Sequence, residues 1–98
     1  MAESASSKAA LQALSRVMAA EWAPLKVRVN ALAPGPFRTD MMEDMEQRFP
    51  GFMQHSANVN MQKRVAEPDE IVGAVLFLAS DASSFVTAQT LSVCGGYG

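Results

Sequence analysis

Two short strand-like segments, separated by a long and mainly helical stretch, limit this chain to few folds. Residues 27–33 place Val27, Val29, Ala31 and Ala33 at alternate positions, which is the period-2 pattern of a strand. Residues 90–94 form a second such segment, and the glycines at 95–96 end it. Parallel strands need a long crossover that usually contains helix. We therefore predict an α/β chain with the element order α-β-α-α-β and two parallel strands.

The first helix is predicted over residues 4–22. This segment is rich in Ala, Leu, Met and Lys, and Leu11, Leu14, Met18 and Trp22 recur at steps of three and four, which indicates an amphipathic helix. The serines at positions 4, 6 and 7 are expected to cap its start. Pro24 is expected to stop the helix, because proline disfavours the helical conformation of the preceding residue and has no N–H to donate.

The middle of the chain is predicted to be helical but interrupted. Pro34-Gly35-Pro36 is expected to break all regular structure; residues 40–49 have helical character, and residues 52–63 indicate loop with a short helix. Pro68 suits the first turn of a last helix that runs to Ala79. This helix is apolar on more than one face, so we expect it to be well buried. Residues 80–84 end it.

Composition excludes several functional classes. The chain has 98 residues, a formal net charge of −2 and no basic block, which argues against nucleic acid as a partner. No apolar run reaches the roughly 18–20 residues that cross a bilayer, and the first residues do not have the pattern of a signal peptide. Cys94 is the only cysteine, so we expect a reducing compartment, the cytoplasm. The length excludes a complete nucleotide-dependent enzyme with about six or seven strands.

Six motifs in order point to a family. They are Ser7-Lys8-Ala9-Ala10-Leu11, Arg28-Val29-Asn30, Pro34-Gly35-Pro36 with Thr39, Glu67-Pro68-Asp69-Glu70-Ile71, Phe77-Leu78-Ala79-Ser80-Asp81 and Gly95-Gly96. Together they resemble the C-terminal portion of a short-chain dehydrogenase/reductase. The resemblance implies that residues 1–98 are one partial domain of a Rossmann-type doubly wound sheet. It also implies descent from enzymes that transfer hydride between NAD or NADP and an alcohol or carbonyl substrate.

The resemblance assigns catalytic roles that this sequence fills only in part. The family pattern is a tyrosine, three residues and a lysine; the lysine falls on Lys8, but the tyrosine position holds Ser4. In the family the lysine binds the nicotinamide ribose and lowers the pKa of the tyrosine, which is the general acid and base. A phenol with a pKa near 10 can be brought toward working pH in this way, whereas an aliphatic hydroxyl is a far weaker acid. Tyr97 lies too far along the chain to replace the tyrosine.

The resemblance also implies a cofactor-binding loop. Pro34, Gly35, Phe37 and Thr39 match the family loop that contacts the nicotinamide end of the cofactor, where exposed backbone groups and a hydroxyl can bind a carboxamide or phosphate. The family's glycine-rich turn for the pyrophosphate has no counterpart in these residues. We therefore expect little cofactor binding and no turnover from the chain alone.

The remaining chemistry-bearing residues have structural interpretations. We expect no metal site, because His55 has no ligand partner at suitable spacing and is interpreted as a surface residue. Cys94 is interpreted as a small half-buried side chain where relatives commonly have Asp. The methionine-rich residues 41–61 match the family's substrate lid, although ordinary packing is the preferred interpretation.

Three hypotheses about function remain open. The chain is a truncated oxidoreductase, inactive alone; or it is an interaction module that pairs with itself or with a full-length relative; or it is a decayed or mis-started reading frame. In the family, the first helix and the last strand build subunit interfaces, so a homo-oligomer through residues 4–22 and the C-terminal strand is expected. Unpaired strand edges and apolar patches also favour association.

Overall fold

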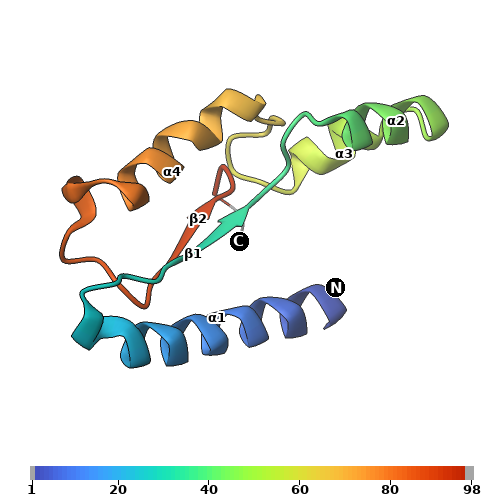
Figure 1. Ribbon diagram of the computed structural model, residues 1–98. Helices are drawn as coiled ribbons and strands as arrows, with labels where there is room; N and C mark the ends of the chain where they lie inside the picture. Colours follow the sequence, from blue (N-terminus) through green and yellow to red (C-terminus); the bar gives the residue numbers. More distant parts are fainter. Residues whose placement is uncertain (1, 97–98) are drawn as a thin grey trace. The chain divides into compact units, whose positions relative to one another are not determined.

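The computed structural model describes residues 2–96 of the chain (Figure 1). Its helices are α1 Ala2–Trp22, α2 Asp40–Arg48, α3 Phe52–Asn58 and α4 Val72–Ala79. Its short 3-10 turns are η1 Ala23–Leu25, η2 Pro68–Ile71 and η3 Asp81–Ser83, and its strands are β1 Ala31–Pro34 and β2 Thr90–Val93. Among the described residues, three helices lie between the strands where the predicted order α-β-α-α-β has two, because α3 is the short helix expected within residues 52–63 and forms a helix of its own. Tyr97 lies outside the described residues.

The two strands form a parallel pair. The amide of Ala31 donates to the carbonyl of Gln89 at 2.8 Å, and the amide of Gly35 donates to the carbonyl of Val93 at 2.8 Å. Both partners advance by four residues in the same direction, which is the register of a parallel ladder. Among the described residues, the sheet has the order β1-β2 (Figure 1). The α/β expectation with parallel strands is thus confirmed.

The chain divides into two compact units, and both strands begin in the first and end in the second. Unit 1 comprises the residues up to Ala33 and Val75–Leu91, and unit 2 comprises Pro34–Ala74 and the residues from Ser92 on. Each unit has its own local contacts.

Unit 1 is organised around α1 and a single arginine. The guanidinium of Arg28 donates through Nη1 to the carbonyl and hydroxyl of Ser83, both at 2.8 Å, and to the carbonyl of Val86 at 3.3 Å. Through Nη2 it donates to the carbonyls of Leu78 and Ser80, both at 3.1 Å. These carbonyls lie where α4 ends, so the arginine satisfies groups that a helix terminus leaves without intrahelical partners.

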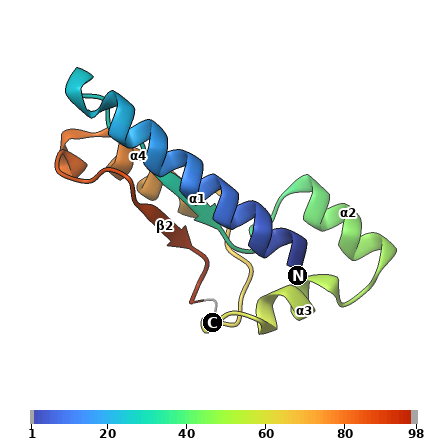
Figure 2. The same cartoon turned by 90° about the horizontal axis from the view of Figure 1, so that it is seen from below.

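Unit 2 contains a helical hairpin, formed by α2 and α3, and a return segment, residues 59–67, which leads from α3 to η2. The amides of Gly51 and Met53 both donate to the carboxylate of Glu46 at 2.8 Å. This carboxylate therefore joins the end of α2 to the start of α3, and the two helices lie side by side (Figure 2). The hydrogen bonds lower the pKa of Glu46 below its usual value. After α3, the amides of Met61 and Gln62 donate to the carbonyls of Gly96 and Gly95.

Two expectations about the strand and its break are corrected. Residues 27–30 are extended but lie outside β1, because side chains replace part of the ladder: the amide of Val29 donates to Oγ1 of Thr87, and the amide of Gln89 donates to Oδ1 of Asn30. Pro34 was expected to break regular structure, yet it is the last residue of β1. Proline is tolerated there because its position faces the unpaired edge of the strand.

Two expectations about helices are also wrong. No residue of α4 is buried, and Leu76 is 62% exposed; the described residues contain too little chain to cover its apolar faces. The serines expected as caps lie within α1, which begins at Ala2. Ser6 and Ser7 are exposed on its surface.

The apolar core is very small. Among the described residues, its buried members are Ala19, Ala31 and Ala57. On α1 the buried positions are Ser15 and Ala19, one turn apart, whereas Leu11 and Leu14 are 49% and 55% exposed. Since burial of apolar area is the main favourable term in folding, most of this chain's apolar surface contributes little to its own stability.

Candidate functional site

The loop after β1 carries the residues expected to bind cofactor, and it packs tightly against β2. Beyond the hydrogen bond from its amide to Val93, Gly35 lies so near Cys94 that an added Cβ would come within 2.7 Å of the Cys94 Cα. Backbone atoms at that distance cannot move aside cheaply. Gly35 therefore fixes the start of the loop against the end of β2 by close approach, whereas the neighbouring Pro34 is exposed.

The backbone N–H and C=O of Phe37 make no hydrogen bond among the described residues. Phe37 forms an isolated parallel bridge with Ala66, made by the amide of Ala66 donating to Pro36 at 2.9 Å and the amide of Arg38 donating to Ala66 at 2.7 Å. In an extended chain, alternate residues point their N–H and C=O groups in opposite directions. The N–H and C=O of Phe37 therefore point away from Ala66, and neither has a hydrogen-bond partner among the described residues.

Thr39 ends the loop as the N-cap of α2. Its Oγ1 accepts from the amide of Met42 at 3.2 Å, which satisfies one of the amides that a helix start leaves without a partner. The Oγ1–H remains available as a donor. Thr39 therefore combines a fixed position with one unused hydroxyl proton.

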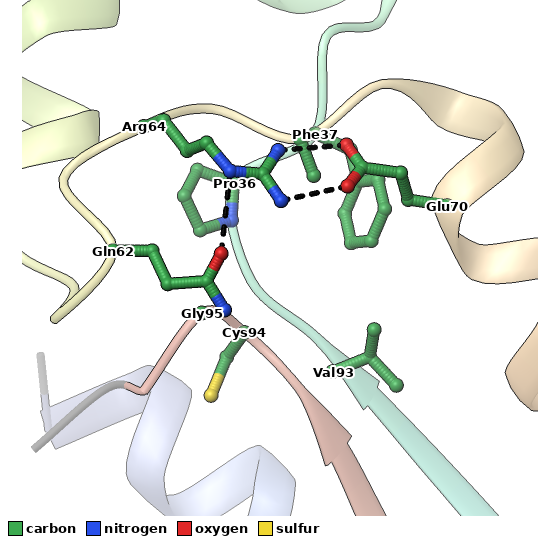
Figure 3. Close-up of a pocket in the computed structure, with 9 residues that line it drawn as sticks. Pro36, Phe37, Gln62, Arg64, Glu70, Val93, Cys94 and Gly95 are labelled. Atoms are coloured by element: carbon green, nitrogen blue, oxygen red, sulfur yellow. Dashed lines mark hydrogen bonds and ion pairs between the residues drawn. The ribbon is translucent and has the colours of Figure 1, made fainter.

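A small pocket lies beside this loop, within unit 2. Its volume is about 140 Å³, and its lining residues are Pro36, Phe37, Gln62, Arg64, Ala66, Glu70, Val93, Cys94 and Gly95. In Figure 3 the guanidinium of Arg64 lies between the carboxylate of Glu70 and the side-chain carbonyl of Gln62. The two ion-pair hydrogen bonds measure 2.8 and 2.7 Å, the bidentate geometry that arginine forms with a carboxylate.

Glu70 is electrostatically the most perturbed group at this site. The hydrogen bonds from Arg64, together with that from the amide of Glu67 at 2.7 Å, lower the pKa of Glu70 to about 2. The same pair raises the pKa of Arg64 above its ordinary value. A carboxylate held this firmly stays ionised and cannot exchange protons near neutral pH. The pair therefore has a structural role: it ties the return segment to the start of η2.

The expected catalytic positions lie in unit 1, on α1. Lys8 is exposed on this helix, and Ser4 lies one turn before it. The expected loop residues Pro34, Gly35, Phe37 and Thr39 lie in unit 2 and follow one another closely in space. The structure thus groups the four loop residues in one unit and places Lys8 with Ser4 in the other.

The other chemistry-bearing residues have the surroundings that their sequence context predicted. His55 is exposed on α3, and Cys94 is half-buried beside Gly35. Within the described part of the chain, no group of three or more His, Cys, Asp or Glu side chains could hold a metal ion. No described helix is both long and apolar enough to cross a membrane.

The sequence assigned no structural role to two arginines, although Arg28 belongs to one of the six motifs. Arg64 pairs with Glu70 across Pro68, and this separation matches neither helical nor strand spacing. The opposite charges on the two sides of a proline that starts a helical turn are only a weak sequence signal for an ion pair. Arg28 reaches partners fifty or more residues away. Only the folded chain reveals either role.

Comparison with known proteins identifies relatives of the whole chain. Residues 2–98 match the family described as Enoyl-(Acyl carrier protein) reductase. The chain is 48% identical, over 93% of its length, to a galactitol 2-dehydrogenase (L-tagatose-forming) of Cereibacter sphaeroides. It is 40% identical, over 92%, to a sorbose reductase of Schizosaccharomyces pombe, of which it covers 34%.

Solved structures similar to this chain are also of reductases and dehydrogenases. A 3-oxoacyl (acyl-carrier-protein) reductase from Agrobacterium tumefaciens with NADP bound matches with a TM-score of 0.83 at 40% identity, over 95% of this chain and 36% of that one. A short-chain type dehydrogenase/reductase from Mycobacterium marinum matches with a TM-score of 0.82 at 36% identity, over 94% and 35%. The chain therefore spans about a third of its relatives, including 35% of the galactitol dehydrogenase.

Proposed function

Because the chain belongs to the short-chain dehydrogenase/reductase family, we propose that it is the nicotinamide-side segment of an oxidoreductase. The reaction is hydride transfer between NAD or NADP and an alcohol or carbonyl substrate. The observation that carries this proposal is that the backbone N–H and C=O of Phe37 have no hydrogen-bond partner among the described residues. One donor and one acceptor, held side by side by the bridge to Ala66, complement the acceptor and donor of a primary carboxamide.

The neighbouring residues support the same assignment. The Thr39 hydroxyl keeps a proton to donate to a phosphate or amide oxygen, while Gly35 holds the loop against β2. Lys8 would bind the nicotinamide ribose, and NAD or NADP would supply or accept the hydride. Ser4 stands where the family has its acid–base tyrosine, and its hydroxyl is too weak an acid for that role. We infer that the 98-residue chain binds cofactor weakly and has no turnover alone.

A titration with NADH and NADPH, followed by amide chemical shifts, tests this proposal. We expect saturable shifts at the amides of Phe37 and Thr39, no shift at Gly73, and no oxidation of either cofactor with a panel of aldehydes and ketones. Phe37→Pro removes the N–H and should abolish the shift at Thr39. Turnover that disappears in Lys8→Ala, or shifts that spare the loop, would contradict the proposal.

A second candidate function is subunit association through α1. Leu11, Leu14 and Val17 form an apolar stripe at helical spacing, and each is about half exposed, at 49%, 55% and 54%. The small residues Ala10 and Ala13 lie beside this stripe and would let a second helix approach closely. An exposed stripe of this kind favours helix pairing. We infer that the chain forms a homo-oligomer through α1, with the C-terminal strand as the other contact.

Light scattering during size-exclusion chromatography tests the association. We expect an oligomer for the unchanged chain and a monomer for Leu14→Glu, with Glu43→Gln on the exposed surface of α2 as the unaffected control. A lone monomer across the micromolar range would remove this candidate. We also infer a cytoplasmic location from the cysteine count of one, since disulfide-rich sequences are typical of oxidising compartments.

A further inference from the structure

A second cavity of unit 2 has a positively charged lining. Its volume is about 260 Å³, and among the described residues no acidic side chain lines it. It shares only Arg64 with the pocket beside the loop after β1, because Phe37 and the end of β2 line that pocket and not this one. The lining of the second cavity includes the cations Arg38, Lys63 and Arg64, the side-chain amide of Gln54 and the apolar side chains of Met53 and Val65.

Two of the three cations keep hydrogen-bond donors without partners among the described residues. The ammonium of Lys63 donates to the carbonyl of Asn58 at 2.7 Å, which leaves two of its three N–H groups. Nε of Arg38 lies 3.2 Å from one carboxylate oxygen of Glu67, and neither Nη atom of Arg38 makes a hydrogen bond to a described residue. The cavity therefore has open donors from two side chains.

The third cation contributes charge rather than donors. Nε and both Nη atoms of Arg64 already donate, to the side chains of Gln62 and Glu70 (Figure 3). The positive charges of Arg38 and Arg64 are partly balanced by their ion pairs, whereas the described partner of Lys63 is a neutral carbonyl. An anion that entered the cavity would therefore meet a positive charge that no carboxylate compensates.

We propose that this cavity binds a phosphate group, which is held by the two Nη atoms of Arg38 and by Nζ of Lys63. A guanidinium binds two oxygens of a phosphate side by side, and an ammonium acts as a point charge on another. A phosphate has enough oxygens for both partners, whereas a carboxylate would have to share its two oxygens between them.

The phosphate site is separate from the groups assigned to the cofactor. Residues 36–38 are extended where they bridge to Ala66, and successive side chains of an extended chain point to opposite faces. Phe37 accordingly lines one cavity and Arg38 the other. The phosphate site therefore goes beyond the proposed function and does not depend on it.

A titration with inorganic phosphate, followed by NMR, tests the proposal. A parallel titration with sodium chloride at matched ionic strength controls for screening. We expect saturable shifts at the backbone amide of Lys63 and at the side-chain amide of Gln54 with phosphate, and no saturable shift at either group with chloride. Arg38→Gln and Lys63→Gln should each weaken phosphate binding about tenfold, since each removes a charged donor.

Matched variants separate phosphate binding from general damage. Lys26→Gln is the control for Lys63→Gln, because both lysines have a left-handed backbone, with φ of 60° and 57°, and Lys26 belongs to unit 1. This control should leave phosphate binding unchanged. Glu67→Gln removes the carboxylate that competes for Arg38 and should tighten phosphate binding about threefold. A damaged chain could not bind more tightly.

The source of the phosphate group is decided by adding NADH to the phosphate-saturated chain. We expect a shift at the amide of Phe37 and no change in the phosphate shift at Lys63. Displacement of phosphate by NADH would assign the cavity to the cofactor's own phosphates and overturn the separate site. Phosphate shifts that chloride reproduces, or that Lys63→Gln leaves unchanged, would also overturn it. Retained phosphate binding without a Phe37 shift would reject the proposed function alone.

Discussion

Units 1 and 2 are held together by different means. In unit 1, one guanidinium donates to backbone carbonyls of residues fifty or more positions along the chain. In unit 2, several separate bonds join the loops: Glu46 binds the start of α3, Arg64 binds Glu70, and the amides of Met61 and Gln62 bind Gly96 and Gly95. Among the residues that the structure describes, neither unit buries a large apolar side chain completely.

The difference shows where each unit is vulnerable. Unit 1 depends on one long-range polar centre, and its loss removes a charged donor from several carbonyls at once. Unit 2 spreads its stabilisation over exposed contacts, each of which contributes modestly. A single substitution should therefore damage unit 1 far more than unit 2, and four experiments test that comparison.

The largest effect is expected for Arg28. Arg28→Ala removes the hydrogen bonds of the guanidinium around the end of α4, so the hydroxyl and the carbonyl of Ser83, which is 1% exposed, each lose one donor. We expect the free energy of unfolding to fall by about 3 kcal/mol or more, measured by urea unfolding followed by circular dichroism. Arg28→Lys should recover only part of the lost free energy, because an ammonium lacks the planar set of donors that a guanidinium has. Exposed Arg16→Ala is the control, and equal effects of the two alanine variants would refute the special role of Arg28.

A smaller effect is expected for Gly35 in unit 2, because this residue lies very close to the backbone of Cys94. Gly35→Ala would place a Cβ 2.7 Å from the Cys94 Cα, which should cost about 1–3 kcal/mol through a backbone shift. Gly73→Ala has nothing within 4 Å of the added atom and should stabilise α4 by about 0.5–1 kcal/mol. The same urea experiment measures both. We expect the two variants to change the free energy of unfolding in opposite directions. An unchanged free energy in Gly35→Ala would mean that the loop packs loosely on β2.

The cap of α2 should have a local effect of about 1 kcal/mol. Thr39→Ala removes the acceptor of the Met42 amide, so hydrogen exchange at that amide should accelerate several-fold. Thr39→Ser retains the hydroxyl and serves as the matched control. Unchanged exchange in Thr39→Ala would show that the cap contributes nothing to the start of α2.

The smallest effect is expected for the exposed ion pair, and it depends on pH. The pKa of Glu70 is about 2 in the folded chain, below its ordinary value of 4.5. The contribution of the pair is therefore complete above pH 4.5 and is lost as the pH falls from about 4.5 toward 2. Carboxyl chemical shifts measure the titration, and Arg64→Gln should return the pKa of Glu70 toward 4.5. A normal pKa in the unchanged chain would show that the bidentate pair does not persist in solution.

Local patterns predicted most of the elements. The C-terminal end of α1, the start of α2, the proline at the start of η2 and the existence of the two strands follow from periodicity, caps and prolines, which act over a few residues. Burial was harder to predict. The apolar faces of α4 indicated a buried helix, yet Leu76 is exposed, because burial depends on neighbours that a local pattern cannot specify.

For the candidate site, too, the sequence predicted some features and the tertiary structure alone revealed others. Motif order alone indicated Pro34, Gly35, Phe37 and Thr39 as a cofactor loop. The bridge to Ala66, which leaves the peptide of Phe37 available, joins residues nearly thirty positions apart, and the pair between Arg64 and Glu70 crosses a turn. Such contacts depend on loop conformation rather than on spacing along the chain.

By itself, then, the sequence determined the family, the order of the elements and the residues that bear chemistry, since these depend on residue type and short-range spacing. The tertiary structure alone decided that Arg28 is the centre of unit 1, that Gly35 must be glycine, and that β1 presents an open edge. The physical reason is that hydrogen bonds, close approach and strand pairing act between segments far apart in sequence, where no local pattern records which groups will meet and which will remain unpaired.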